Sequence, residues 1–170
     1  MKRQQRIDLY KAVCERIQIE NKIAEKASTK SWQDYLPYFK DHPSFVKIKE
    51  ERGEQEAVIE MLLANRQSPI FDSLLSNSRE YRRVNDDIEK IRQNMNQPTY
   101  DKLVSLFMKL VTINKHFIAI SLLVSKHREP TDSYRLIKKS IAEGEERIEE
   151  VHRDIRMMAY AYIQPLIEFR

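Results

Sequence analysis

One pair of residues in this chain has the spacing of a metal-binding helix. Glu149 and His152 stand three positions apart, which places a carboxylate and an imidazole on one helix face. Di-iron helical bundles use this pair twice and add two further glutamates. The other histidines have no glutamate three residues before them: His42, His116 and His127. Because the pattern occurs once, among alternating charges, we interpret it as a solvated surface and predict no metal site.

Nucleophilic chemistry has equally little support. Cys14 is the only cysteine, and it falls between apolar residues of a predicted helix, where a thiol is ordinarily protonated and inert. The chain has two glycines, too few for phosphate-cradling loops that need positive φ, and no nucleophile elbow. We therefore predict no catalytic residues and no cofactor, and we interpret the protein as non-enzymatic.

Basic residues are concentrated at the N-terminus. Residues 1–30 hold eight Lys or Arg against four acidic residues, whereas the other 140 residues hold 22 of each. A basic helix can follow a phosphate backbone, so nucleic-acid binding is one hypothesis. Its candidate residues are Lys2, Arg3, Arg6 and Lys11. No zinc-finger, RNP or basic-zipper signature accompanies them, and four acids dilute the patch: Asp8, Glu15, Glu20 and Glu25.

Aromatic residues gather in the segment that follows this basic stretch. Five of the fifteen aromatics fall within 14 residues, from Trp32 to Phe45. Such residues are the usual anchors of protein interfaces, which makes this connector a candidate docking site. The candidate partner-binding residues are Trp32, Tyr35, Tyr38 and Phe39. The alternative is a plug that closes one end of a helical bundle.

The elements that position these residues are predicted to be helices separated by prolines. Proline cannot occupy a helix interior without losing a hydrogen bond, so it marks element boundaries. We expect helices over 3–27, 44–66, 68–95, 98–124 and 131–170. Ser68 and Pro69 predict an N-cap and a first helical residue, and Thr131 or Asp132 a second cap. The polar middle of 44–66, around Gly53, predicts a bend or fraying.

The C-terminal segment carries the longest apolar pattern. From Tyr134 to Phe169, seam positions follow at alternating steps of three and four residues, which predicts one helix with a coiled-coil-like seam. A helix of about 35 residues is about 50 Å long, so it needs long neighbours or a second chain. We therefore predict a homodimer whose seam contains Ile148, Val151, Ile155, Met158 and Tyr162.

Residues 103–124 form the most apolar segment, long enough to cross a bilayer. Lys109, Lys115 and His116 near its middle would be costly in hydrocarbon, which favours a buried central helix and no membrane span. Cys14 as the lone cysteine, together with a charged N-terminus lacking an apolar stretch behind it, favours the cytoplasm.

Together these patterns predict an all-α protein. The expected fold is an elongated up-and-down bundle of four or five long helices with coiled-coil-like seams, in a single domain of 170 residues. Its parts are a basic N-terminal helix (1–30), an aromatic connector (31–43), bundle helices (44–130) and a long C-terminal helix (131–170). The first functional hypothesis is a cytoplasmic adaptor or regulator that binds protein partners through helices, as a homodimer. The alternative is a nucleic-acid-binding factor.

Overall fold

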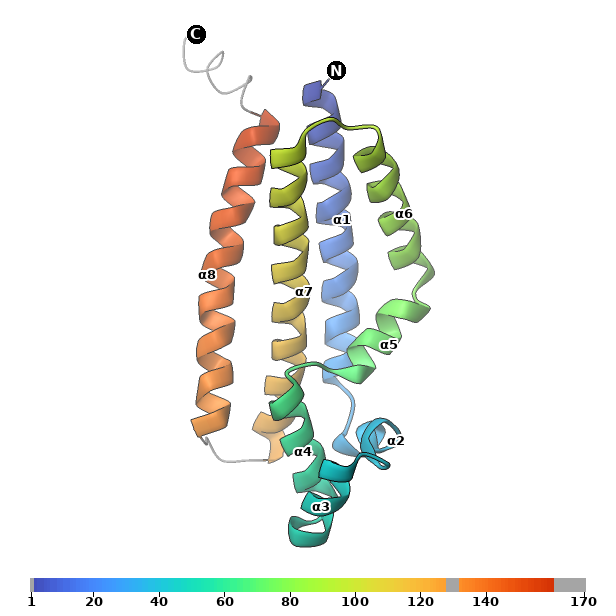
Figure 1. Cartoon of the computed structure of the whole chain (residues 1–170), viewed down its shortest axis with the longest axis vertical. Coiled ribbons are helices and arrows are strands. Elements are labelled where there is room, and N and C mark those ends of the chain that lie inside the picture. Colours follow the sequence, from blue (N-terminus) through green and yellow to red (C-terminus); the bar gives the residue numbers. More distant parts are fainter. Residues whose placement is uncertain (1, 128–131, 161–170) are drawn as a thin grey trace.

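The structure is a computed structural model that describes residues 2–127 and 132–160, and every regular element in these ranges is helical. Three long helices form the body of the molecule: α1 (Lys2–Ser28), α7 (Pro98–His127) and α8 (Asp132–Tyr160). They run side by side along the long axis, which gives the molecule an elongated shape (Figure 1). The predicted all-α class is confirmed.

The shorter helices connect the lower end of α1 to the upper end of α7. At the lower end the chain turns through three short elements: η1 (Trp32–Tyr35), α2 (Leu36–Phe39) and α3 (Pro43–Arg52). It returns upward through α4 (Glu54–Asn65), α5 (Pro69–Asn77) and α6 (Arg79–Gln93) (Figure 1). The α6 helix packs against α1, whereas α7 packs against both α1 and α8.

The helix predicted over 44–66 is two helices, and the break lies where the sequence predicted a bend or fraying, at Gly53. Its φ of 92° lies in the left-handed region that favours glycine, and the backbone N–H of Gly53 donates to the carbonyl of Lys49 as the last bond of α3. The polar stretch around it contains no other residue that adopts positive φ. Gly53 therefore separates α3 from α4.

The single helix predicted over 68–95 is interrupted as well. Ser68 caps α5 as expected, since its Oγ accepts a 3.2 Å hydrogen bond from the N–H of Phe71. Ser78 caps a second helix in the same way, accepting from the N–H of Tyr81 at 3.2 Å. Serine competes with the helical backbone for hydrogen bonds, and here that competition ends α5 and begins α6.

The α7 helix is long and apolar enough to cross a membrane by length and composition, with a mean hydropathy of 1.5 in its most apolar window. A core helix of a bundle has the same properties. In the structure α7 lies between α8 and α1, and several of its side chains, including Val104, Ile120 and Val124, are fully buried (Figure 1).

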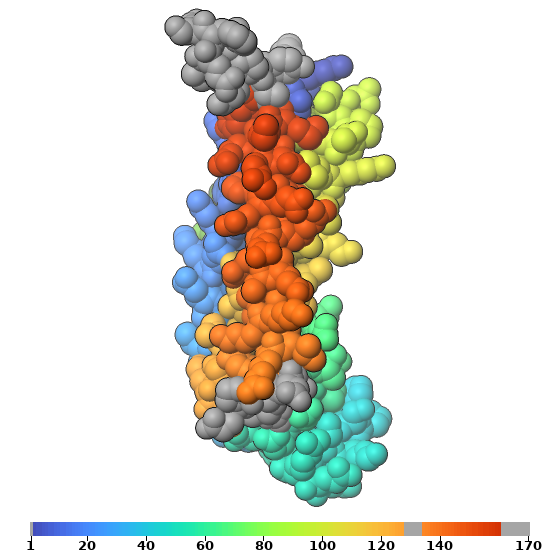
Figure 2. Space-filling model, turned by 90° about the vertical axis from the view of Figure 1, so that its left-hand side faces the viewer, coloured from blue at the N-terminus to red at the C-terminus, as the bar shows by residue number. Residues whose placement is uncertain are grey.

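The predicted dimer seam on α8 lies largely inside the single chain. Val151 and Ile155 are buried in a cluster that α1, α6 and α7 share with α8, and Ile148 and Met158 are half-buried against it. Tyr162 lies outside the described residues. The described seam is therefore covered by α1 and α7 of the same chain, which follow α8 over most of its length (Figure 2). The homodimer remains a prediction.

Candidate functional site: a groove between α1, α7 and α8

Two adjoining depressions form one continuous groove on the surface of the bundle. The upper one has a volume of about 440 Å³ and lies between α1, α7 and α8, and the lower one, of about 430 Å³, lies between α1 and α7. Asn21 and Lys115 line both depressions, which joins them into what we call the α1–α7–α8 groove. On α1 the groove extends from Cys14 to Ser28, a length of about 20 Å at the helical rise per residue.

The floor of the groove is apolar at both ends, and Asn21 and Asn114 lie between these apolar parts. The upper part is lined by Ile17, Phe107, Val111 and Ile148, and the lower part by Ala24, Ile118 and Leu122. Of these side chains Leu122 is the most open to solvent, with 45% of its surface exposed. An exposed leucine at the end of an apolar strip is a feature of binding surfaces.

The rim of the groove is charged. Glu145 and Glu149 stand on the α8 side and Glu25 on the α1 side, all three exposed, whereas Lys115 of α7 lies where the two depressions meet. An apolar floor with a charged rim is the usual anatomy of a protein-binding surface.

Two asparagines that line the groove have side-chain carbonyl oxygens without hydrogen-bond partners. Asn114 of α7 is buried, with 5% of its surface exposed, and its Oδ1 has no hydrogen-bond partner; Oδ1 of Asn21 is buried without one as well. A Cβ at Gly144 of α8 would stand 3.0 Å from Oδ1 of Asn114, so the glycine leaves room for this oxygen. Neither asparagine is among the binding residues predicted from the sequence.

His152 closes the upper end of the groove, and the prediction that it is solvated is wrong. Its Nε2 shares a 2.7 Å hydrogen bond with the hydroxyl of Tyr10, and its ring stacks on Phe107 at 5.2 Å between centroids. Burial, followed by the nearby charge of Arg156, lowers the pKa of His152, so the imidazole is neutral at pH 7. Its neighbour Glu149 is exposed, as predicted.

Cys14 lines the same end of the groove and is half-buried. Burial raises the pKa of its thiol, and burial also raises the pKa of the adjacent Tyr10, to about 12. Both groups therefore hold their protons at neutral pH, which disfavours a nucleophilic thiolate. Across the part of the chain that the structure describes, no three His, Cys, Asp or Glu side chains are grouped to hold a metal ion.

The aromatic connector divides into core and surface residues. Tyr35 and Phe39 are buried in the lower core and stack on each other at 6.3 Å between ring centroids. Trp32 is half-buried against the same core, and Tyr38 is 48% exposed. The placement of Tyr35 and Phe39 matches the plug alternative. Docking through Trp32 and Tyr38 remains a prediction.

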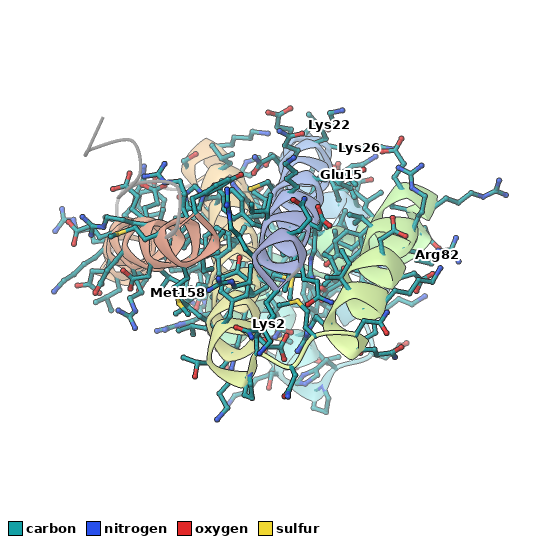
Figure 3. All side chains as sticks on the ribbon, turned by 90° about the horizontal axis from the view of Figure 1, so that it is seen from above. Lys2, Glu15, Lys22, Lys26, Arg82 and Met158 are labelled. Atoms are coloured by element: carbon teal, nitrogen blue, oxygen red, sulfur yellow. The ribbon has the colours of Figure 1, made fainter. Side chains whose placement is uncertain are left out.

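The basic residues of α1 do not form one continuous face. Lys2 and Lys11 are exposed, whereas Arg3 and Arg6 are half-buried. Seen along the bundle, Lys22 and Lys26 lie on one side of α1 together with Glu15, away from Lys2 (Figure 3). Glu15 also forms a 3.4 Å ion pair with Arg83 of α6. Binding of nucleic acid through Lys2, Arg3, Arg6 and Lys11 remains a prediction.

Glu20 lies inside the bundle, which corrects the prediction that it dilutes a solvated basic patch. Its side chain is 1% exposed and accepts hydrogen bonds from Arg16 Nε at 3.1 Å, the Tyr81 hydroxyl at 2.9 Å and the Thr112 hydroxyl at 2.9 Å. Arg16 also stands 5.2 Å from the ring centre of Tyr81. The carboxylate thus connects α1 to α6 and α7, and burial raises the pKa of Tyr81 to about 12, with the charge of Glu20 adding to the shift.

A second buried polar group ties the lower core to α7. His116 Nδ1 accepts a 3.0 Å hydrogen bond from the N–H of Ser68, and its Nε2 lies 3.2 Å from Oδ1 of Asp72. The hydroxyls of Tyr35 and Ser68 share a further 2.7 Å bond. In a catalytic triad the imidazole is hydrogen-bonded to the serine hydroxyl. Here the imidazole of His116 accepts from the backbone N–H of Ser68 and the hydroxyl of Ser68 is bonded to Tyr35, so these residues form a structural network.

The groove has the features of a binding site: an apolar floor, a charged rim and two hydrogen-bond acceptors without partners. Asn21 and Asn114 each stand at a seam position of an apolar helical pattern in the sequence, and this position is the signal that could have identified them. Comparisons with protein-family models, with curated protein sequences and with solved structures found no match to this chain.

Proposed function

We propose that this protein is a non-enzymatic adaptor or regulator that binds an amphipathic helix of a protein partner in the α1–α7–α8 groove. The observation that carries the proposal is the largely apolar floor, which extends for about 20 Å along α1 and α7 beneath a charged rim. A helix of about 14 residues has this length, and its apolar face would cover the floor while its polar face stays in water.

A helical occupant suits the groove better than an extended peptide. Extended peptides gain affinity by pairing with the edge of a sheet, and the described residues form no sheet. The floor is made mainly by α1 and α7, and residues three and four apart supply it on α7: Phe107, Val111, Asn114, Ile118 and Leu122. Ridges of a third helix pack into such a surface.

Two finer features belong to the same proposal. The coiled-coil-like seam predicted for α8 would extend the bundle beyond a single chain, and a homodimer would bring two grooves together. Because Val151 and Ile155 are already buried, we expect such a dimer to use other residues. Light scattering after gel filtration, at tens of micromolar protein, distinguishes the mass of a monomer from that of a dimer. A strictly monomeric mass would exclude the dimer.

The groove is tested with a helical peptide selected from a displayed library against the whole chain. Leu122→Glu places a charge on the apolar floor at a side chain that is 45% exposed, so it should weaken peptide binding at least tenfold without unfolding the protein. Fluorescence anisotropy of the labelled peptide measures the affinity, and circular dichroism checks that the variant remains helical.

Leu136→Glu is the matched control. Leu136 is 58% exposed on α8 and is not a groove residue, so the same change of side chain should leave the affinity within twofold of the wild type. Equal affinities of the two variants would place the peptide elsewhere and contradict the proposal.

A further inference from the structure

The centre of the groove is lined by two hydrogen-bond acceptors that have no donor among the described residues. Oδ1 of Asn114 and Oδ1 of Asn21 are both buried and unpartnered, and Asn114 as a whole is more than nine-tenths buried. A buried polar atom without a hydrogen bond is costly, and native structures contain few of them. Asparagine in an apolar seam is retained where it selects a partner or a register. The two oxygens therefore indicate a donor that arrives with the ligand.

Acidic residues outnumber basic residues among the side chains that line the groove. Glu145 and Glu149 line the upper depression and Glu25 the lower one, and none of the three forms an ion pair with another described residue. Lys115 is the opposing charge, at the junction of the depressions. Among the residues that line the groove three carboxylates stand against one lysine, which favours a cationic ligand there, while Arg153 and Arg156 lie with Glu149 in a neighbouring depression.

We infer that the docked helix carries an arginine at its centre, which inserts between Asn21 and Asn114 and faces Glu149. The inference rests on the proposed function and specifies its partner. The guanidinium has five N–H donors in a planar fork, so one side chain can serve both amide oxygens and still meet the carboxylate. A lysine offers the same charge with less fixed geometry. A leucine would leave both oxygens unpartnered.

The test uses synthetic copies of the selected helical peptide that differ only at the central residue: arginine, lysine, leucine or glutamate. Calorimetric titration against the wild-type chain should give the arginine peptide at least tenfold higher affinity than the leucine peptide, and the glutamate peptide the lowest. In Asn114→Leu the preference for arginine over leucine should fall to twofold or less. The unfolding midpoint of Asn114→Leu should equal or exceed that of the wild type, because an unsatisfied buried oxygen is removed.

Asn85→Leu is the control for this change, since Oδ1 of Asn85 on α6 is also buried without a partner but lies outside the groove. It should keep the full preference for arginine. Should Asn114→Leu fail to fold, Glu149→Gln replaces it, because Glu149 is exposed; the arginine peptide should then bind at least threefold more weakly and the leucine peptide unchanged.

The outcomes separate the two proposals. Peptides that bind the groove, as the Leu122→Glu variant reports, but with leucine as tight as arginine overturn the arginine inference alone. A preference for arginine that survives in Asn114→Leu also overturns it. If no peptide binds at all, both the inference and the proposed function are wrong.

Discussion

Polar side chains that lie fully or partly inside the bundle are the residues that sequence patterns misassigned most clearly. Glu20 and His152 both stand among charged neighbours, and a charged residue in a helix is ordinarily solvated. Contacts with other helices withdraw both side chains from water. Glu20 accepts hydrogen bonds from Tyr81 of α6 and Thr112 of α7, and His152 is hydrogen-bonded to Tyr10 and stacks on Phe107. Spacing within one helix carries no information about which distant hydroxyl will meet a carboxylate.

Neutralising Glu20 should destabilise the bundle. Glu20→Gln leaves Arg16 half-buried without its counter-charge and weakens the bonds from Tyr81 and Thr112, so we expect a loss of about 2–4 kcal/mol of unfolding free energy. Urea denaturation measures it. Glu25→Gln, an exposed change in the same helix, should stay within about 0.5 kcal/mol of the wild type, and equal effects of the two substitutions would contradict this role of Glu20.

His116 should make stability depend on pH. Burial lowers its pKa below the ordinary value of 6.5, an effect that the nearby carboxylate of Asp72 and the more distant one of Glu20 reduce but do not reverse. The unfolded state therefore binds the proton more readily, so the contribution of His116 is present above pH 6.5 and is lost as the pH falls below it. Protonation would also remove the acceptor that Nδ1 offers to Ser68.

His116→Asn tests this contribution because the amide can still accept from Ser68 and does not titrate. Urea unfolding between pH 7.5 and 5.0 should show a steeper loss of stability in the wild type than in the variant. Parallel curves would mean that His116 does not contribute to the pH dependence.

At the scale of elements, prolines and capping residues were good guides and continuous helices were not. Ser68 with Pro69, and Pro98, begin helices where the sequence predicted them. The polar stretch around Gly53 predicted a bend, and the chain breaks there, whereas Ser78 divides a helix that the apolar pattern had joined. An isolated serine is tolerated inside many helices, so the break at Ser78 depends on tertiary packing that the local pattern does not contain.

Gly53→Ala should destabilise the protein through the backbone alone. No atom lies within 4 Å of the added methyl group, so the penalty comes from placing a side chain at a φ of 92°. We expect a loss of about 1–3 kcal/mol by urea denaturation. An unchanged or raised stability would show that α3 and α4 can join into one helix without cost.

For the whole molecule, composition and periodicity were enough to predict an elongated all-α protein. They did not predict which helices cover the apolar seam of α8. The length of the seam had suggested a second chain, whereas α1 and α7 of the same chain pack against it. The groove was not predicted either. It depends on α1 and α8 flanking α7 on one side, which is a property of the assembled bundle and not of any single helix.

The central claim is that a partner helix occupies the α1–α7–α8 groove, and nuclear magnetic resonance of the side-chain amides tests it most directly. A ¹⁵N-labelled chain is titrated with the arginine-centred peptide. If the helix occupies the groove, the side-chain amide signals of Asn21 and Asn114 should show saturable shifts, with those of Asn85 unchanged. Saturable binding that shifts the signals of Trp32 or Asn85 and leaves Asn21 and Asn114 unmoved would contradict it.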